Sequence, residues 1–528
     1  MVALLTLVSR VTGLARDMLL AWWLGNNWIQ DSFNYAFRMP NLFRNLLGEG
    51  ALSAAFVPLI SGRLAREGRA AGGEFFNSVA TALTVALVGA TAAVLALIAG
   101  VYATRGSDPH TRLLLWLTAT MTPYMIFVCL VALVGALLNC LDRFSWPAFM
   151  PVVLNMLQVA AMALAVPALA RWLPEREQQV YVVAGAVLAA GVVQLVLMLW
   201  RLRREGFGWR WGWRPRDPDL RRLAVMMGPM VLGLGILQFG AWLDDQVIIW
   251  LTAVGEKQTW QLGAWRVWLP LTEGALSAVN QARRMYQFPV GVLAISLATA
   301  AFPAFSRYAA REDWAGLRGA LGGALRLAVF EAVPASVGLI VLAGPIMRVV
   351  FERGRYTPAD AAYAAHILRF YSLGIWAYCA QAIIVRGFYS LQDTLTPLRV
   401  MSKTVALAIA VNLTLIWAAP LGAAVFGLST SVMASLNVVL LGRELGRRLP
   451  GVEWRGVLGV AARVAGASVA MGGAAWLAQA YLPWRNKYAL LGACMGIGLV
   501  VFAGACRVLR IGEAGEFWHL ARRGGRAD

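Results

Sequence analysis

Charged side chains interrupt stretches of this chain that are otherwise apolar enough to lie in a lipid bilayer. They are arginines and acids, at Arg10, Arg16, Arg44, Arg284, Asp31 and Glu49. A charge at the centre of a membrane helix costs about 2.5–3.5 kcal/mol on an insertion scale, so such residues usually face an interior cavity. The planar guanidinium fork suits phosphate and carboxylate. We therefore expect a water-filled interior that receives an anionic substrate.

The composition indicates a membrane protein with many crossings. Hydrophobic residues make up 59% of the 528 residues and charged residues 14%, against about 25% charged in a soluble domain. Several uncharged runs reach the roughly 20 residues needed to cross the hydrocarbon core. They lie at 77–104, 113–141, 144–170, 178–200, 223–243, 285–306 and 404–442. The predicted fold class is an all-α polytopic membrane protein.

Apolar periodicity and its punctuation predict about fourteen transmembrane helices. We expect them at 2–24, 29–61, 77–104, 112–140, 146–170, 178–201, 220–252, 271–303, 317–343, 360–389, 396–418, 421–445, 457–481 and 487–509. The expected organisation is an N-terminal bundle over 1–201, a basic linker over 202–219, a C-terminal bundle over 220–445, two additional helices over 446–510 and a basic tail over 511–528. Two bundles around a central cationic cavity are the usual architecture of a rocking transporter.

The net charge of +20 is distributed in the pattern that orients membrane proteins and not in one typical of nucleic-acid binding. Arginines crowd the loops near 62–76, 201–219, 304–316 and 446–456 and the C-terminal tail. Cytoplasmic loops carry such an excess of basic residues. With an even number of crossings, this places both termini in the cytoplasm.

One predicted helix, 29–61, carries a polar stripe. At about 100° per residue, its members fall within about 80° of one another: Asp31, Asn34, Arg38, Asn41, Asn45 and Glu49. The stripe predicts either a cavity lining or a polar seam between helices. Ionisable groups of both signs favour the cavity. Arg44 lies off the stripe, beyond a kink expected at Pro40.

Further polar groups lie on other predicted helices. Ser277, Asn280, Gln281 and Arg284 share one face of helix 271–303, and Arg10 and Arg16 lie in helix 2–24, where they either line the cavity or extend to the interface. The adjacent pair Asp244 and Asp245 suits a cation site, a salt bridge or an interfacial position. The five cysteines lack paired spacing and the three histidines are scattered, so no metal site or cofactor is assigned.

Several motifs make the chain resemble the MurJ (MviN) family of lipid II flippases, within the multidrug/oligosaccharidyl-lipid/polysaccharide exporter superfamily. They are Ser-Arg-Val-Thr-Gly-Leu-Ala-Arg-Asp at 9–17, Pro-Asn-Leu-Phe-Arg-Asn-Leu-Leu-Gly-Glu-Gly at 40–50, Ala-Leu-Ser-Ala-Ala-Phe-Val-Pro at 51–58, and further runs at 135–149, 227–229, 288–293, 353–357 and 387–397. The match is specific from residue 9 to about residue 400, in the family's order.

The resemblance implies a transporter that moves lipid II from the cytoplasmic to the periplasmic leaflet of the bacterial inner membrane by alternating access, for cell wall synthesis. It carries the family's cavity residues onto Arg10, Arg16, Asp31, Asn41, Arg44, Glu49, Ser277 and Arg284. It also implies coupling to membrane potential or to a monovalent cation, Na⁺ or H⁺, for which Asp244, Asp245 and Asp393 are candidates. The expected partners are lipid II, membrane lipids and the cell wall synthesis machinery, with the chain acting as a monomer.

The chain departs from the family pattern near its expected cavity. Many members have an arginine where this chain has Asn45, and acids where it has Arg283 and Gln287. Three alternatives stay open: a flippase for another undecaprenyl-pyrophosphate-linked oligosaccharide, a drug/cation antiporter and a membrane glycosyltransferase. Clustered arginines disfavour the antiporter, and the lack of a large soluble loop disfavours the enzyme.

Overall fold

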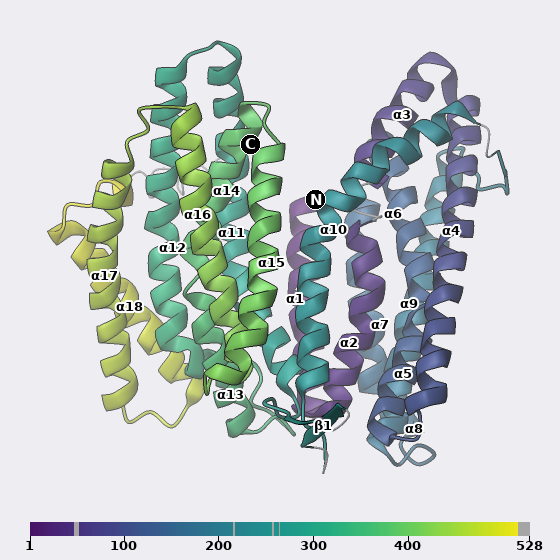
Figure 1. Ribbon diagram of the computed structural model, residues 1–528, viewed down its shortest axis with the longest axis horizontal. Helices are drawn as coiled ribbons and strands as arrows, with labels where there is room; N and C mark the ends of the chain where they lie inside the picture. The colour runs from purple at the N-terminus through teal and green to yellow at the C-terminus, as the bar shows by residue number, and fades with distance from the viewer. Residues whose placement is uncertain (47–51, 215–216, 256–257, 263–264, 516–528) are drawn as a thin grey trace. The chain divides into compact units, whose positions relative to one another are not determined.

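Long helices make up almost all of the described chain in the computed structural model (Figure 1). The structure describes residues 1–46, 52–214, 217–255, 258–262 and 265–515. Eleven helical segments of this part are long and apolar enough to cross a membrane: Gly68–Arg105, Pro109–Cys140, Ser145–Leu169, Arg176–Arg204, Ala275–Ala310, Trp314–Val350, Pro358–Ser390, Leu395–Ala418, Ala424–Arg448, Trp454–Tyr481 and Lys487–Val508. The chain is a multi-pass helical membrane protein, as the hydropathy predicted.

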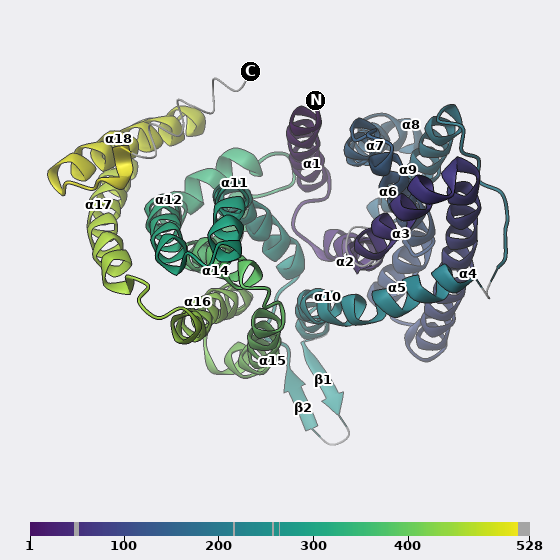
Figure 2. The same cartoon turned by 90° about the horizontal axis from the view of Figure 1, so that it is seen from above.

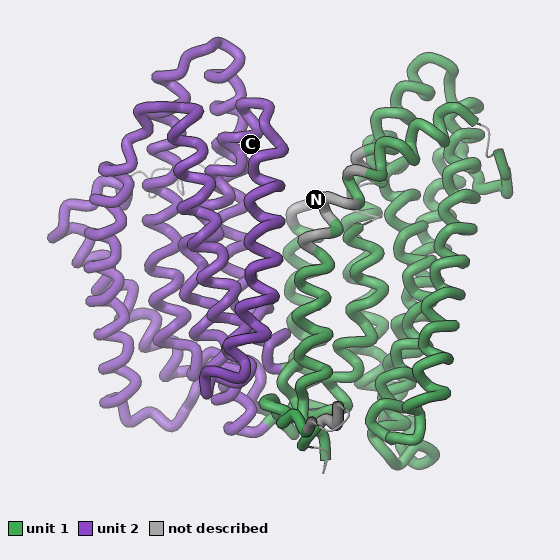
Figure 3. The backbone as a smooth tube through the Cα atoms, viewed as in Figure 1, with its two compact units in different colours: residues 1–277, 353–356 green, residues 278–352, 357–528 purple. Residues whose placement is uncertain are grey.

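The chain folds into two compact units, coloured separately in Figure 3. Unit 1 comprises Met1–Ser277 and Arg353–Tyr356. Its helices are α1 Val2–Leu24, α2 Trp28–Phe43, α3 Leu52–Arg66, α4 Gly68–Arg105, α5 Pro109–Met121, α6 Tyr124–Cys140, α7 Ser145–Ala160, a π-helical turn Ala161–Ala165, α8 Val166–Leu169, α9 Arg176–Arg204 and α10 Pro218–Leu251. Within it α1 packs on α7, α2 on α5, and α6 on α9.

Unit 2 comprises Ala278–Glu352 and Thr357–Asp528. Its helices are α11 Ala275–Ala310, which begins in unit 1, α12 Trp314–Val350, α13 Pro358–Ser372, α14 Ile375–Ser390, α15 Leu395–Ala418, α16 Ala424–Arg448, α17 Trp454–Tyr481 and α18 Lys487–Val508. Helix α12 packs against α13, α14, α17 and α18, so the two additional helices of the sequence analysis pack within this unit (Figure 2).

Each of the fourteen predicted helices coincides with one or more observed ones, and the differences have local causes. The helix predicted at 112–140 is interrupted before α6, where Pro123 lacks a backbone N–H. The helix predicted at 360–389 is interrupted at Gly374, where an added Cβ would lie 2.8 Å from Cα of Ser431. The helix predicted at 29–61 leaves regular α geometry after Phe43, three residues beyond Pro40. Residues 47–51, including Glu49, lie outside the described part.

Two features differ from the sequence-based expectation. An antiparallel hairpin pairs β1 Thr259–Leu262 with β2 Trp265–Trp268, visible as arrows in Figure 2, and is an addition to the predicted all-α fold. The predicted division at 202–219 also differs from the observed one. Helix α10 packs on α2, α3 and α4, and therefore belongs to unit 1 and not to a second bundle beginning at residue 220.

The basic linker is docked along unit 1 by backbone donors and apolar side chains. The N–H of Arg210 donates to the side-chain oxygen of Asn77 at 2.9 Å, and the N–H of Gly212 donates to the Thr81 hydroxyl at 3.1 Å. Phe207 is buried in the same core as Phe56 and Phe75. These contacts fix the linker on α4 and direct the chain into the start of α10.

Candidate functional site

Asp31 and Ser277, both predicted as site residues, lie together in unit 1. The Asp31 carboxylate is fully buried and accepts the N–H of Gly274 at 2.9 Å, the N–H of Ser277 at 2.7 Å and the Ser277 hydroxyl at 2.6 Å. Asn34 donates to the same hydroxyl at 3.0 Å. Helix N-termini leave backbone N–H groups unpaired and favour negative charge. Asp31 therefore caps α11, and its contacts are with the protein itself.

The polar stripe of α2 forms, along one edge, a seam with α10. Tyr35 donates to Gln246, Arg38 Nε lies 3.2 Å from Oδ2 of Asp245, and Asn45 donates to Gln238 at 3.3 Å. These pairs match the seam interpretation along this edge, and the cavity lining that the sequence favoured stays a prediction. A polar helix–helix seam satisfies polar groups that would otherwise face lipid.

Two more residues of the predicted site have local partners. Asn41 donates to the carbonyl of Phe37 in its own helix at 2.9 Å. Asp245, a predicted cation-coupling residue, has the Arg38 ion pair, which is the salt-bridge alternative of the sequence analysis. Its neighbour Asp244 is half-buried on α10.

Arg16 is held at the contact between α1 and α7. Its guanidinium donates to Asp17 at 3.0 and 2.7 Å and to Asn155 at 3.2 Å, and lies 5.5 Å from the ring centroid of Phe37. Asn155 in turn donates to Thr12 at 3.1 Å. Only 11% of the Arg16 side chain is exposed. Arg10, on the same helix, is exposed.

Arg16 and Arg44 both lie within electrostatic range of Tyr124, a buried residue at the start of α6 in unit 1. The Tyr124 hydroxyl donates to Gln194 at 3.3 Å, and Gln194 donates to the carbonyl of Met150 at 2.7 Å. The two arginines come from different segments, α1 and the residues after α2. Of the three predicted site arginines in the described part of unit 1, Arg10, Arg16 and Arg44, the last two therefore share a buried neighbour.

Unit 2 contributes a second arginine site. Arg284, the predicted residue, is exposed, whereas Arg283 is buried to 9% exposure. Arg283 Nε donates to the Tyr371 hydroxyl at 3.0 Å, and Tyr286 stacks on the Tyr371 ring at a centroid distance of 4.9 Å. The sequence marked Arg283 only as a departure from the family pattern. Its tyrosine partner is 88 residues away, so no local pattern could indicate the pair.

Asp393, the third predicted cation-coupling residue, caps a helix. It accepts the N–H groups of Leu395 and Thr396 at 3.1 and 3.0 Å, at the start of α15, and forms an ion pair with Arg448. Partial burial raises the pKa of Asp393, but the Thr396 hydrogen bonds and the Arg448 charge outweigh burial and hold the pKa below its usual value. These contacts give Asp393 a structural role in the observed conformation.

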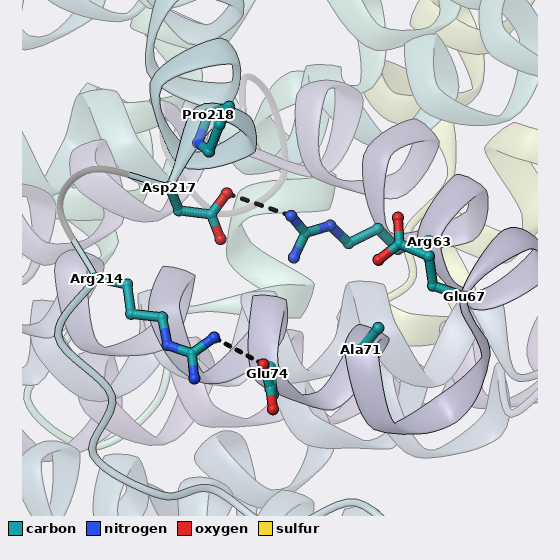
Figure 4. Close-up of a pocket in the computed structure, with 7 residues that line it drawn as sticks. All are labelled: Arg63, Glu67, Ala71, Glu74, Arg214, Asp217 and Pro218. Carbon is teal, nitrogen blue, oxygen red and sulfur yellow. Dashed lines mark hydrogen bonds and ion pairs between the residues drawn. The ribbon is translucent and has the colours of Figure 1, made fainter.

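A pocket in unit 1 lies where α3 and α4 meet the linker (Figure 4). Arg63 lies 3.3 Å from Asp217 and 2.7 Å from Asp219, and Arg214 lies 2.7 Å from Glu74. Positive and negative side chains therefore alternate around this pocket and neutralise one another. It lacks the arginine excess expected of an anion site, and we assign it to linker docking. Within the described residues, no group of three or more His, Cys, Asp or Glu side chains could hold a metal ion.

The Arg-Gly-Arg-Tyr segment at 353–356 packs on the end of α1, within unit 1. The N–H of Arg355 donates to the carbonyl of Trp22 at 3.0 Å. Gly354 has a φ of +59°, and an added Cβ would lie 2.4 Å from Cδ1 of Trp22. Gly25 has a φ of +79°, and a Cβ added there would lie 3.1 Å from the carbonyl oxygen of Arg355. Both positions require glycine.

Known proteins match this chain over most of its length. The family model described as "Lipid II flippase MurJ" matches residues 20–492. The probable lipid II flippase MurJ of Vibrio cholerae is 32% identical, over 92% of this chain and 89% of its own length. The lipid II flippase MurJ of Burkholderia cenocepacia is 29% identical, over 96% of this chain and 95% of its own length.

Solved structures show the same fold at low identity. The chain matches a lipid II flippase MurJ in an inward closed conformation with a TM-score of 0.73 and 21% identity, over 96% of this chain and 98% of that one. It matches an inward-facing multidrug resistance MATE family transporter of the MOP superfamily with a TM-score of 0.67 and 10% identity, over 84% of this chain and 94% of that one. With the family model covering most of the sequence, the chain belongs to the MurJ family of lipid II flippases.

Proposed function

We propose that this protein moves the head group of lipid II, a lipid-linked peptidoglycan precursor, from the cytoplasmic to the periplasmic leaflet. The observation that carries the proposal is Arg16, a largely buried arginine held by Asp17 and Asn155 in a unit that contains membrane-spanning helices, with Arg44 in electrostatic range of the same tyrosine, Tyr124. Relatives named as lipid II flippases over most of the chain support the same substrate.

The chemistry of the arginines fits a pyrophosphate. A guanidinium donates two parallel hydrogen bonds to a phosphate, and such charge-assisted bonds are about twice as strong as neutral ones. Arg16 is already oriented by Asp17 and Asn155, so an incoming phosphate would exchange with the Asp17 carboxylate. Arg44 would supply the second fork.

The arrangement of basic segments supports an orientation with both termini in the cytoplasm. In unit 1, Arg69 donates to the Glu205 carbonyl and Arg214 pairs with Glu74, so loops 62–76 and 201–219 share one end. In unit 2, Arg318 donates to the Pro450 carbonyl, so the start of α12 and loop 446–456 share one end. Positive residues concentrate on the cytoplasmic side, and the inner membrane is the expected location.

The remaining elements of the proposal follow from the family. Alternating access would carry the head group across while the undecaprenyl chain stays in lipid. Membrane potential or a monovalent cation would drive the cycle, and the chain would work as a monomer beside the cell wall synthesis machinery. The ion pairs of Asp245 and Asp393 make these two acids, with Asp244 next to Asp245, candidates for contacts that rearrange during the cycle.

Charge reversal at Arg44 tests the proposal. In cells depleted of their own lipid II flippase, the Arg44→Glu protein should insert normally and export no lipid II, whereas Arg44→Lys should keep part of the activity. Export by the Arg44→Glu protein at the wild-type rate would contradict anion capture. Normal insertion of wild type with export of a different undecaprenyl-pyrophosphate-linked sugar would identify that sugar as the substrate.

A further inference from the structure

One acid in unit 2, Glu331, lies at the middle of a membrane helix. Helix α12 runs from Trp314 to Val350, which leaves roughly 25 Å of helix on each side of Glu331 at about 1.5 Å per residue. The hydrocarbon core is about 30 Å thick. Between Arg326 and Arg348 the helix carries no charged residue other than Glu331, so Glu331 lies within the apolar stretch of α12, where an ionisable residue is expensive and usually functional.

The other charged residues of α12 have partners of their own. Arg318 donates to the Pro450 carbonyl at 2.7 Å, Arg326 lies 3.6 Å from Glu513, and Arg348 lies 2.7 Å from Glu352. For Glu331 the described part of the chain provides neither a hydrogen bond nor an ion pair. The side chain is half-buried, so the carboxyl is partly shielded yet still accessible.

The helices around α12 do not offer Glu331 a counterion. Helices α13, α14, α17 and α18 pack against α12. From α14, the Cys379 thiol lies within electrostatic range of Glu331. Other ionisable groups on these four helices contact residues other than Glu331: His366 with Phe370, Tyr371 with Arg283, Tyr378 with Tyr286, Arg386 with Thr299, Arg463 with Gly459, and Lys487 with Glu352. The remaining basic ones, Arg369, Arg455 and Arg507, are exposed.

We propose that Glu331 is a proton-binding site in the membrane interior of unit 2. A carboxylate without a counterion in a low-dielectric medium is neutralised in preference to being left charged. A hard metal cation needs several oxygen ligands, and the identified neighbour is a thiol. A proton needs only the carboxylate oxygen itself. Uptake converts the carboxylate to a neutral carboxylic acid, and release returns the carboxylate and H⁺.

The position of Glu331 couples its charge to the helix backbone. Pro334, three residues further along α12, has no N–H to donate to the carbonyl four residues before it. Prolines inside helices are common sites of kinks, so a change of charge at Glu331 would act beside a point where the helix can bend. Proton uptake and release at Glu331 would couple a proton gradient across the membrane to the transport cycle. This coupling rests on the proposed function, whereas the proton site itself does not.

Carbodiimide labelling tests the proton site without lipid II. Dicyclohexylcarbodiimide attacks protonated carboxyl groups in apolar surroundings and leaves a stable N-acylurea. The purified full chain in lipid vesicles would be labelled from pH 6 to pH 9, and peptide mass spectrometry would locate the adducts. Labelling at Glu331 should fall about tenfold per pH unit above its titration point, and Glu331→Gln should abolish it. An unlabelled Glu331, or labelling independent of pH, overturns the proposal.

Glu352 provides a matched control outside the membrane span. Partial burial raises the pKa of Glu352, but the bonds and charges of Arg348 and Lys487 outweigh burial and hold it below its ordinary value. Glu352 is therefore expected to remain ionised and unlabelled over the same pH range. The Glu352→Gln protein should label at Glu331 as wild type does, which would show that the reagent reports the environment of Glu331.

Transport under an imposed pH gradient tests the coupling. Vesicles with wild-type protein should move lipid II from the cytoplasmic to the periplasmic leaflet several-fold faster when a proton gradient drives protons toward the cytoplasmic side than when there is no gradient. Glu331→Gln should lose this difference. A response retained by Glu331→Gln overturns coupling through this residue. Wild-type protein that is labelled at Glu331 but exports no lipid II contradicts the proposed function and leaves the proton site standing.

Discussion

The carboxylate of Asp31 accepts both the N–H and the hydroxyl of Ser277, at 2.7 and 2.6 Å, and so closes the N-terminus of α11. These residues are 246 positions apart in the chain. Their side chains were predicted to bind substrate, yet in this conformation they bind each other. A transporter can use such a contact in one state and release it in another, because a helix terminus needs some acceptor.

Removing this cap should destabilise the protein. Asp31→Ala leaves buried N–H groups and a hydroxyl without their acceptor, and each unsatisfied buried group costs about 1–3 kcal/mol. Thermal unfolding in detergent should therefore begin several degrees lower. Asp31→Asn, which keeps one oxygen acceptor, should lie between Asp31→Ala and wild type. Arg10→Ala, at an exposed position, is the control. Equal midpoints for all four proteins would contradict the capping role.

The seam between α2 and α10 predicts a charge-swap rescue. Arg38→Asp and Asp245→Arg should each destabilise the protein, because each leaves like charges facing across the 3.2 Å contact. Together they restore opposite charges. We expect a coupling energy of about 1–3 kcal/mol in a double-mutant cycle measured by unfolding. Strictly additive effects would mean that this pair does not join α2 to α10.

The ion pairs of Glu205, near the start of the linker, with Arg143 and Arg201 predict a dependence of stability on pH. The hydrogen bond from Arg143, with the charges of Arg143 and Arg201, holds the pKa of Glu205 below its ordinary value. A lowered pKa gives stability that is present above the unfolded-state pKa, about 4.3, and is lost as pH falls through the folded-state pKa. Melting temperatures should fall in that acidic range, and Arg143→Ala should reduce the slope. An unchanged slope would contradict the role of Arg143.

The docking of segment 353–356 predicts an unequal response to two glycine substitutions. Gly354→Ala places a methyl group 2.4 Å from the Trp22 ring in a left-handed backbone conformation, and should destabilise the protein by about 1–3 kcal/mol. Gly344→Ala, in the interior of α12 with no atom within 4 Å of the added Cβ, should be neutral or stabilising. Comparable unfolding midpoints for the two variants would contradict close packing at Gly354.

The sequence predicted the helices well because their signal is local. A run of apolar residues must cross the bilayer as a helix so that its backbone N–H and C=O groups are hydrogen-bonded. Pro40 and Pro123 lie where helices are interrupted because proline has no N–H to donate. The β1–β2 hairpin was missed because four-residue strands leave little periodicity to detect. The assignment of α10 to unit 1 depends on its contacts with α2, α3 and α4, which no hydropathy pattern contains.

The candidate site was harder to predict because its partners are distant in the chain. The stripe on α2 was correctly identified as polar, but the wheel could not show that Arg38 meets Asp245 or that Asp31 meets Ser277. Tyr124 was missed because it is a buried aromatic residue in an apolar run. The substrate contacts of Arg10, Arg16, Arg44 and Arg284, and those of Glu49 outside the described residues, stay predictions.

The measurement that tests the account most directly is the appearance of lipid II on the periplasmic face of cells depleted of their own flippase. Wild-type protein should restore exposed lipid II, and Arg284→Ala, on an exposed face of α11, should reduce it at least tenfold while inserting normally. Arg386→Ala, which removes a peripheral arginine bonded to Thr299, should export like wild type. Correctly inserted wild-type protein that exposes no lipid II would contradict the central claim.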